Sequence, residues 1–248
     1  MRPSKARDAL AFCLGIVLIG AMIQGAGALK GNDLVFPGVT EILRAFLRLL
    51  GEAKTWQRIG VTMAHVLSAL AVSTAIGVGV GVLQGLCGFV RRLLQPLMSF
   101  LRAIPMVVLI FIVMVLMDYD YVPVVASSLI LIPMIAEAAC EGCLRIDREL
   151  IDVYRMSGGF SLTELWRVYL PLMAGYLRQA YVNAVGMGVK LAVSTVYLVQ
   201  TKNSLGRAVT DSTYFLEYQD VYAYALIMIL LVLLLSELPL AILRRLQK

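Results

Sequence analysis

Long, uninterrupted apolar runs constrain the fold of this chain more than any other feature of its sequence. Such runs occupy residues 9–29, 61–89, 98–117, 122–143, 176–199 and 221–243, separated by short polar segments. A transmembrane helix needs about 20 apolar residues, and a helix satisfies all of its backbone polar groups in lipid. A transmembrane β-barrel would instead need segments of about ten residues with alternating polarity. The sequence therefore predicts an all-α, polytopic membrane bundle of about six transmembrane helices.

The composition agrees with a membrane protein that consists of one domain. Hydrophobic residues make up 60% of the 248 residues, charged residues make up 15%, and the mean hydropathy is +0.84. Soluble domains contain about 25% charged residues. Six spans with short connections leave no room for a soluble domain of ordinary size, so residues 1–248 are interpreted as a single transmembrane domain in a lipid bilayer.

The net charge of +6 is spread over the connections and the flanks of the spans. A nucleic-acid-binding protein would gather such charge in a dense basic patch, so no nucleic-acid partner is expected. Lys and Arg favour the cytoplasmic side of membrane proteins. More of them lie on the cytoplasmic segments if the N-terminus is inside, which predicts that both termini and the connection 144–172 are cytoplasmic.

The first apolar run has a second interpretation. Arg2, Lys5 and Arg7 precede it, and small residues occupy positions 25–28 at its end. This arrangement also suits a cleaved signal peptide, although the apolar run is long for one. We expect the run to be retained as the first span.

Glycines four residues apart in the second run predict close helix packing. Gly77, Gly81 and Gly85 repeat at this interval, with Gly79 between them. Small residues at such spacing let two helix backbones approach closely in lipid. We expect a packed interface, either within the chain or between two copies.

Residues that could perform catalysis or bind a metal are sparse. Cys140 and Cys143 form a C-x-x-C without a second pair or a nearby histidine, so neither metal nor redox chemistry is expected. His65 is the single histidine, and a contact inside the bundle is the simplest role for it. The sequence therefore predicts no catalytic residues and no metal site.

The connection 144–172 is the most polar and most structured of the loops. Asp147 can cap a short helix that ends near the glycines 158–159, and the S-x-x-E at 161–164 is a capping box for a second helix. Pro171 should end or bend that helix. Its apolar stripe consists of Leu162, Leu165, Trp166 and Tyr169. Such a stripe suits either the membrane surface or the groove of a partner protein.

The spacing within this connection resembles the EAA loop of permease subunits from binding-protein-dependent ABC importers. That loop reads E-A-A, three residues, G, nine residues and I-x-L-P. The counterparts in this chain are Asp152, Val153, Tyr154, Gly158, Val168, Leu170 and Pro171. Only Gly158, Leu170 and Pro171 are identical to the pattern. A literal E-A-A at 137–139 lies inside the fourth predicted span and lacks the glycine and the L-P at the required distances.

Other segments resemble the sulfonate, taurine and nitrate type of permease, and this likeness extends over most of the chain. They are F-P-G-V at 36–39, L-R-A-I-P at 101–105 and N-S-L-G at 203–206. The resemblance implies a bacterial inner-membrane protein that imports a small polar or anionic nutrient, such as a sulfonate, nitrate or a vitamin precursor.

The resemblance also implies the partners of the chain. Two permease copies, expected to be identical, would form the pathway, an extracytoplasmic binding protein would deliver the substrate, and a cytoplasmic ATPase dimer would supply energy. The loop around Asp152 to Gly158 would then seat in the ATPase. The chain has no G-x-x-x-x-G-K-[ST] motif, so ATP and Mg²⁺ are expected on the partner and no cofactor is expected here.

Charges inside the spans are candidate pathway residues, because a charge in hydrocarbon is costly unless it is paired or faces a cavity. Lys190 either lines the pathway for an anionic substrate or pairs with Glu137 or Glu141. Tyr197 stands where related chains carry an acidic residue. Arg102 is expected to act as an anchor at the membrane interface. Glu237 is expected to pair with Arg244 or Arg245.

Two other functions remain open at this point. The transmembrane subunit of an energy-coupling-factor vitamin transporter also contacts ATPases through cytoplasmic helices, but the spacing from Gly158 to Pro171 argues against it. An intramembrane enzyme would need a nucleophile with a base or clustered metal ligands. An ion-gradient carrier would show paired broken helices or an internal repeat, and the sequence shows neither.

Overall fold

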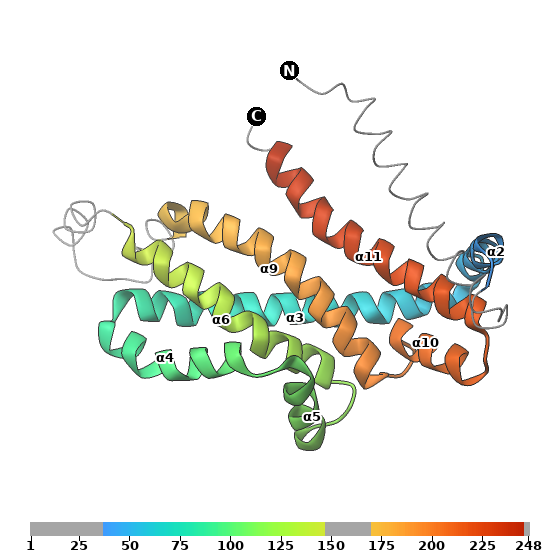
Figure 1. Ribbon diagram of the computed structural model, residues 1–248. Helices are drawn as coiled ribbons and strands as arrows, with labels where there is room; N and C mark the ends of the chain where they lie inside the picture. Colours follow the sequence, from blue (N-terminus) through green and yellow to red (C-terminus); the bar gives the residue numbers. More distant parts are fainter. Residues whose placement is uncertain (1–36, 147–169, 246–248) are drawn as a thin grey trace.

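The computed structural model describes residues 37–146 and 170–245, and this part of the chain is entirely helical (Figure 1). Its helices are α2 (Val39–Leu50), α3 (Ala53–Leu86), α4 (Gly88–Ala103), α5 (Met106–Leu116), α6 (Val122–Leu144), α9 (Leu170–Val199), α10 (Leu205–Tyr214) and α11 (Tyr218–Arg245). Within it, three helices are long and apolar enough to cross a membrane, or four if α4 and α5 form one bent span. The prediction of a helical membrane bundle is confirmed.

The observed helices follow four of the predicted spans closely. Helix α6 matches the run 122–143 to within one residue, and α3, α9 and α11 include the predicted runs almost completely but start earlier. The first turns of α3, which precede the predicted run, contain Lys54 and Arg58. Hydropathy marks only the apolar part of a helix, so it missed these turns. The predicted span 9–29 lies outside the described residues.

The predicted span 98–117 is not one straight helix. Helices α4 and α5 meet at an angle of 105° around Ile104 and Pro105. Ile104 has φ −68° and ψ 129°, an extended conformation, because the ring of the following proline disfavours the helical region. Pro96, in contrast, is accommodated inside α4. The bend lets amphipathic α4 lie along the bundle while α5 projects from it (Figure 1).

The directions of the helices define two ends of the bundle. Gly77 lies beside Ile135 and Gly85 beside Cys143, so α3 and α6 run parallel. Ser127 bonds to Thr195 and Leu131 lies against Gly188, so α9 returns in the opposite direction beside α6. Parallel neighbours require the chain to cross back between them, which is the role of α4 and α5. Helices α3 and α6 thus end where α9 begins.

The glycines of α3 form a tight seam with α6, which confirms the predicted interface and places it within the chain. A Cβ atom on Gly77 would lie 2.8 Å from Ile135 Cβ, and one on Gly81 would lie 2.3 Å from the carbonyl oxygen of Ala136. A Cβ atom on Gly85 would lie 2.4 Å from Cys143 Cβ. Around Gly79, on the other face of α3, a Cβ atom would meet nothing within 4 Å.

Small polar side chains join the helices inside the bundle. The Ser128 hydroxyl donates to the carbonyl oxygen of Ala69 at 3.1 Å, which ties α6 to α3. Ser127 and Thr195, both fully buried, lie 3.3 Å apart between α6 and α9. Such contacts stabilise membrane helices modestly. His65 is half buried on α3, and its Nδ1 has no hydrogen-bond partner in residues 37–146 and 170–245.

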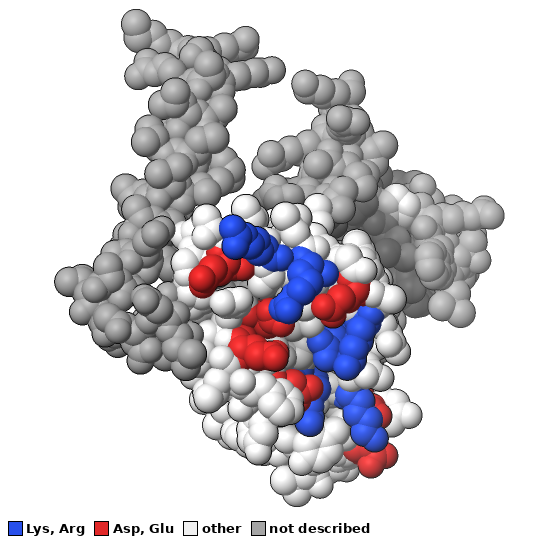
Figure 2. Space-filling view, turned by 90° about the vertical axis from the view of Figure 1, so that its right-hand side faces the viewer, with Lys and Arg blue, Asp and Glu red and all other residues white. Residues whose placement is uncertain are grey.

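Helix α2 is held against the start of α11 at the opposite end of the bundle. Arg48 forms an ion pair with Asp220, whose residue is only 9% exposed. One helical turn further, Arg58 donates to the Tyr224 hydroxyl at 2.5 Å and its guanidinium lies 5.5 Å from the ring centroid. Figure 2 shows basic and acidic side chains interspersed on this end, so most of its charge is locally balanced.

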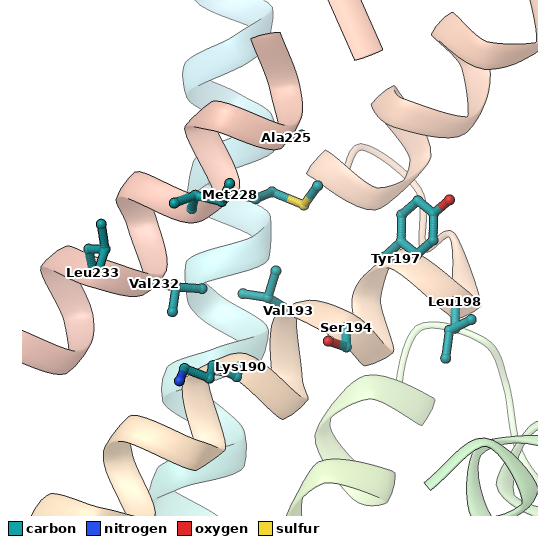
Figure 3. A pocket seen from close by; sticks show the side chains of 10 residues that line it. Lys190, Val193, Ser194, Tyr197, Leu198, Ala225, Met228, Val232 and Leu233 are labelled. Atoms are coloured by element: carbon teal, nitrogen blue, oxygen red, sulfur yellow. The ribbon is translucent and has the colours of Figure 1, made fainter. Parts of the chain in front are cut away.

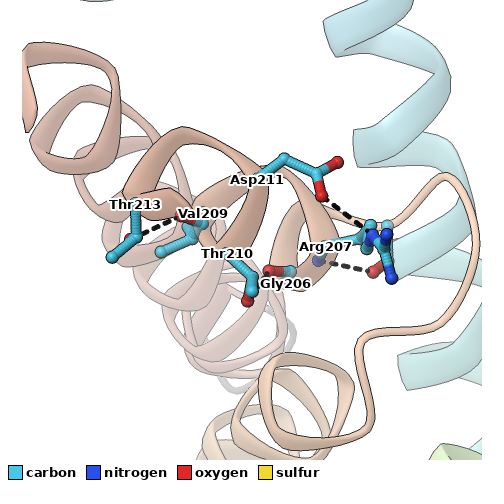
Figure 4. A network of polar contacts seen from close by, with 7 residues as sticks. Gly206, Arg207, Val209, Thr210, Asp211 and Thr213 are labelled. Atoms are coloured by element: carbon cyan, nitrogen blue, oxygen red, sulfur yellow. Dashed lines mark hydrogen bonds and ion pairs between the residues drawn. The ribbon is translucent and has the colours of Figure 1, made fainter. Parts of the chain in front are cut away.

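The N-S-L-G segment at 203–206 connects α9 to α10 through a close backbone contact. The Ser204 hydroxyl caps α10 by accepting from the Arg207 amide at 3.1 Å, and the Leu205 amide donates to Thr62 Oγ1 at 3.0 Å. A Cβ atom on Gly206 would lie 2.4 Å from the carbonyl oxygen of Val196. Helix α10 then carries the Arg207–Asp211 ion pair on its exposed side (Figure 4). The motif therefore fixes α10 against α9 and α3.

Candidate functional site

The two residues predicted to face a pathway lie on one groove between α9 and α11. Lys190 and Tyr197 are seven residues apart on α9, which places them on the same face of the helix. Figure 3 shows Lys190, Val193, Ser194 and Tyr197 along one wall, with α11 as the other wall. The groove has a volume of about 670 Å³. The side chains that it takes from α11 include Met228, Val232 and Leu233.

Lys190 is the charged residue of an otherwise apolar groove. It is exposed, and it forms no ion pair within the described part of the chain. The pairing with Glu137 or Glu141 that the sequence allowed is not present, because Glu137 pairs with Arg102 instead. An ammonium group turned toward lipid tails costs about 2.5–3.5 kcal/mol or more. The groove therefore suits a surface that faces water or another protein.

A separate, polar cavity lies between α3, α4 and α6. It has a volume of about 130 Å³, and its lining includes two arginines, two glutamates and two glutamines: Arg91, Arg102, Glu137, Glu141, Gln84 and Gln95. The Arg102–Glu137 ion pair joins α4 to α6 across this cavity. Arg102 was expected as an anchor at the membrane interface, and its pairing with Glu137 was not predicted.

Sequence analysis missed the cavity because its charges come from helices that are distant in the chain. The available signal is periodic: Arg91 and Gln95 are four residues apart, as are Glu137 and Glu141. Residues at this interval share one face of a helix. Two polar faces at matching depths could have suggested that α4 and α6 meet, but not that Gln84 of α3 joins them.

Most of the predicted coupling loop falls outside the described residues. These positions are Asp152, Val153, Tyr154, Gly158 and Val168. Leu170 and Pro171 are the first two residues of α9, where proline is tolerated because the first turn needs no backbone donor. The literal E-A-A at 137–139 lies within α6, and Ala139 is fully buried against Gly81. It therefore belongs to the helix seam and not to a loop. The side chains of Glu237, Arg244 and Arg245 also fall outside the described ones.

Residues 73–248 match the family model described as the inner membrane component of binding-protein-dependent transport systems. The match covers more than half of the chain, so the chain belongs to this family of ABC importer permeases. This confirms the resemblance stated from the sequence. It also makes the chain a multi-pass component of a transport system and favours a transporter over the intramembrane enzyme that remained open.

Individual relatives carry the same kind of name. A probable ABC transporter permease protein of Brucella melitensis is 25% identical over 195 residues, which cover 76% of this chain and 77% of the relative. The taurine transport system permease protein TauC of Escherichia coli is 23% identical over 220 residues, covering 86% and 79%. The glycine betaine transport system permease protein OpuAB of Bacillus subtilis is 24% identical over 144 residues, covering 58% and 50%.

Proposed function

We propose that this permease forms one half of a translocation pathway and couples it to ATP hydrolysis by a separate cytoplasmic ATPase. The observation that carries the proposal is the course of α9. This helix runs without a break from Leu170 to Val199, a length of roughly 45 Å. It begins with the last two residues of the predicted coupling loop and carries Lys190 and Tyr197 on the groove near its other end.

A continuous helix of this kind can transmit a movement over its whole length. Asp152, Val153, Tyr154, Gly158 and Val168 would seat in the ATPase, and closure of the ATPase dimer would displace Leu170 and Pro171 at the base of α9. Packed helices shift as rigid elements, so the same displacement would reach the groove and alter its width. ATP and Mg²⁺ would stay on the ATPase, and this chain would bind no cofactor.

The remaining partners follow from the same proposal. A second permease copy, identical in the simplest assembly, would complete the pathway, and an extracytoplasmic binding protein would deliver the substrate at the end formed by α2 and α10. Two basic residues at that end are ion-paired, Arg48 with Asp220 and Arg207 with Asp211. The other end carries Arg91 and Arg92 in α4. Over the whole sequence, Lys and Arg are more numerous on the segments assigned to this other end, twelve against seven, which supports a cytoplasmic location for both termini and for the connection 147–169.

We infer that the substrate is a small polar or anionic nutrient. Related permeases are named for taurine and for glycine betaine, both small charged solutes. Lys190 would attract the anionic group of such a solute in the groove, and the Tyr197 ring with its hydroxyl would contact the rest of it. Selection among substrates would rest largely with the binding protein.

The test of the coupling role is the substitution Gly158→Trp, with Gly88→Trp as a matched control. Gly88 is exposed at the turn between α3 and α4, and a Cβ atom there meets nothing within 4 Å. Both variants should insert into the membrane. We expect the Gly158 variant to lose co-purification of the ATPase and to lose uptake, while the control keeps both. Normal uptake by the Gly158 variant would refute the docking role.

Topology has its own measurement. A reporter fused after Lys248 should give a cytoplasmic signal, because α11 starts at the α2 end of the bundle, as α3 does, and runs away from that end (Figure 1). An extracytoplasmic signal would reverse the orientation and would exchange the proposed docking sites of the ATPase and of the binding protein.

A further inference from the structure

The cavity between α3, α4 and α6 holds charges that neither the coupling loop nor the α9–α11 groove explains. Two arginines and two glutamates line about 130 Å³ of space, so the charges of the lining sum to zero. Glu137 lies seven residues before the end of α6, roughly 10 Å along the helix axis. The cavity is therefore below the level of the helix ends, inside the apolar part of the bundle.

The charged rim of this cavity is unsuited to lipid. The side chains of Arg102 and Glu137 are 41% and 53% exposed, although they pair with each other. Each charge turned toward hydrocarbon costs about 2.5–3.5 kcal/mol or more, and the exposed part of an ion pair still loses its hydration. This face of α4 and α6 must therefore meet water or protein in the assembled transporter.

Gln84 adds a polar group from α3 to the lining of this cavity. Its residue is 7% exposed and lines the cavity, and its amide atoms are not among the fully buried polar atoms that lack a partner in the described part of the chain. The amide is therefore open to the cavity space, where water or a solute can bond to it. Such a molecule can accept from it or donate to it, since Gln84 presents both donors and an acceptor.

We propose that the α3–α4–α6 cavity is a solute-binding station on the translocation pathway, matched to a small solute that carries both a positive and a negative group. This proposal rests on the proposed function as a permease. A solute with both charges can place its anionic group on Arg102 and its cationic group on Glu137, exchanging one internal pair for two charge-assisted contacts. The net charge of the cavity stays at zero.

A simple anion fits less well for the same electrostatic reason. It would draw Arg102 away and leave the Glu137 carboxylate without its partner, and an unpaired charge in a membrane interior is strongly unfavourable. Arg91 and Glu141 repeat the same balance beside the first pair. The lining therefore discriminates by charge pattern, whereas the α9–α11 groove offers one positive charge in an apolar wall.

The experiment measures the reactivity of a cysteine placed at the rim. Gln95→Cys lines the cavity, and Leu97→Cys, two residues away on the same helix and 50% exposed, is the matched control. Both are made with Cys13, Cys87, Cys140 and Cys143 replaced by serine. Positively and negatively charged, membrane-impermeant thiol reagents are applied to membranes that contain the folded permease with its ATPase.

We expect the Gln95→Cys thiol to react about tenfold faster or more than the control with reagents of either sign, because hydrocarbon suppresses the reactive thiolate. Glycine betaine or taurine at millimolar concentration should slow this reaction, and sulfate should not. In the background of Glu137→Gln, sulfate should slow it too, because Arg102 has then lost its internal partner.

Two outcomes would overturn the proposal. Reaction of Gln95→Cys no faster than that of Leu97→Cys would show that the cavity is closed to water and that the Arg102–Glu137 pair only fastens α4 to α6. Equal protection by sulfate and by the solutes of mixed charge in the protein that keeps Glu137 would remove the proposed selectivity. Both readouts are separate from the proposed function as a whole, which fails only if no ATPase co-purifies or no solute is transported.

Discussion

The α3–α6 seam and the α9–α11 groove are both made by pairs of long apolar helices, yet they differ in every respect that matters for function. In the seam, Gly81 brings the backbones so close that a Cβ atom would lie 2.3 Å from a carbonyl oxygen. In the groove, large side chains such as Tyr197 and Met228 leave about 670 Å³ between the helices. Residue size alone produces this contrast, because lipid supplies no hydrophobic force that would close the groove.

The contrast separates a fixed part of the molecule from an adjustable part. A seam with backbone contacts has one arrangement, since any sliding would bring Cβ atoms into collision. A groove with exposed walls can change its width at little cost in packing. Helix α9 contacts both α6, which belongs to the seam, and α11, so it joins the two parts. Movement during transport is thus expected to occur at α9 and α11 and not between α3 and α6.

The largest effect should come from breaking the seam. Gly81→Ala forces α3 away from α6, because the new methyl group meets backbone atoms that cannot rotate aside. We expect a loss of about 1–3 kcal/mol in the free energy of unfolding. Gly79→Ala is the control, and it should leave stability unchanged or raise it by up to about 1 kcal/mol, since alanine favours helix and the site is open.

Denaturation of the two purified variants in detergent measures this difference. Equal stability of Gly81→Ala and Gly79→Ala would show that α3 and α6 can separate without cost. The seam would then be no more fixed than the groove, and the comparison between the two regions would fail.

The second effect concerns the groove and is a change in transport with little change in stability. Lys190→Ala removes the positive charge, and we expect the efficiency of uptake of an anionic substrate to fall about tenfold, or about 1.4 kcal/mol in transition-state free energy. Lys190→Arg should retain most of the uptake because it keeps the charge. Ser194→Ala, on the same wall of the groove, serves as the control.

Initial rates of uptake over a range of substrate concentrations distinguish a pathway role from a structural one. A pathway lysine changes the kinetics of the protein that reaches the membrane. Reduced expression of Lys190→Ala with unchanged kinetics in the surviving protein would instead assign Lys190 to folding, and the groove would lose its proposed role.

Hydropathy and glycine spacing predicted the seam, while the groove and the cavity depended on packing that the sequence does not display. The apolar runs predicted α3, α6, α9 and α11, and the spacing of Gly77, Gly81 and Gly85 predicted a close contact between helices. The partner of that contact could not be known, because small residues such as Ala136 and Ala139 are common in any membrane helix. Lys190 was singled out because a charge is unusual in a span, and Tyr197 because it stands where related chains carry an acidic residue.

The bend at Pro105 was not predicted, for a different reason. The apolar run 98–117 is continuous, so hydropathy joined the end of α4 to α5. The Ile104–Pro105 pair carried a local signal against a straight helix, but Pro96 and Pro133 carry the same signal and lie inside helices. Only the packing of α4 along the bundle decides which proline bends the chain. The polar cavity depends on that bend and was missed with it.

A third and smaller effect is expected at the end of the groove, where the Arg48–Asp220 pair fastens α2 to α11. Asp220→Asn keeps the shape of the side chain and removes its charge. Asp220 is nearly buried but Arg48 is 60% exposed to solvent, so the pair should contribute only about 1 kcal/mol to stability. Raising the salt concentration should weaken the unmodified protein more than the variant.

The comparison variant for this pair is Arg207→Gln, which breaks the Arg207–Asp211 pair in α10, where both side chains are partly exposed. Thermal unfolding at low and high salt should show a larger loss for Asp220→Asn than for Arg207→Gln. The opposite order would mean that α2 does not restrain α11, and that the groove is limited by other contacts.

The smallest effect should come from Ser127→Ala, which removes the hydrogen bond between α6 and α9 at the boundary of the fixed and adjustable parts. Ser127 and Thr195 are fully buried and 3.3 Å apart, but Thr195 also donates to the carbonyl oxygen of Leu191 at 2.8 Å. Thr195 therefore keeps a partner in the variant, and the loss should be about 0.6 kcal/mol, typical of a polar contact between membrane helices. Denaturation in detergent measures this loss against that of Ser128→Ala, which removes the hydrogen bond to Ala69 of α3.

The same two variants also test which helices move. If α9 moves during transport while α3 and α6 stay together, Ser127→Ala should alter the rate of uptake and Ser128→Ala should alter stability alone. A change of uptake in both variants, or in Ser128→Ala alone, would place the moving boundary within the seam.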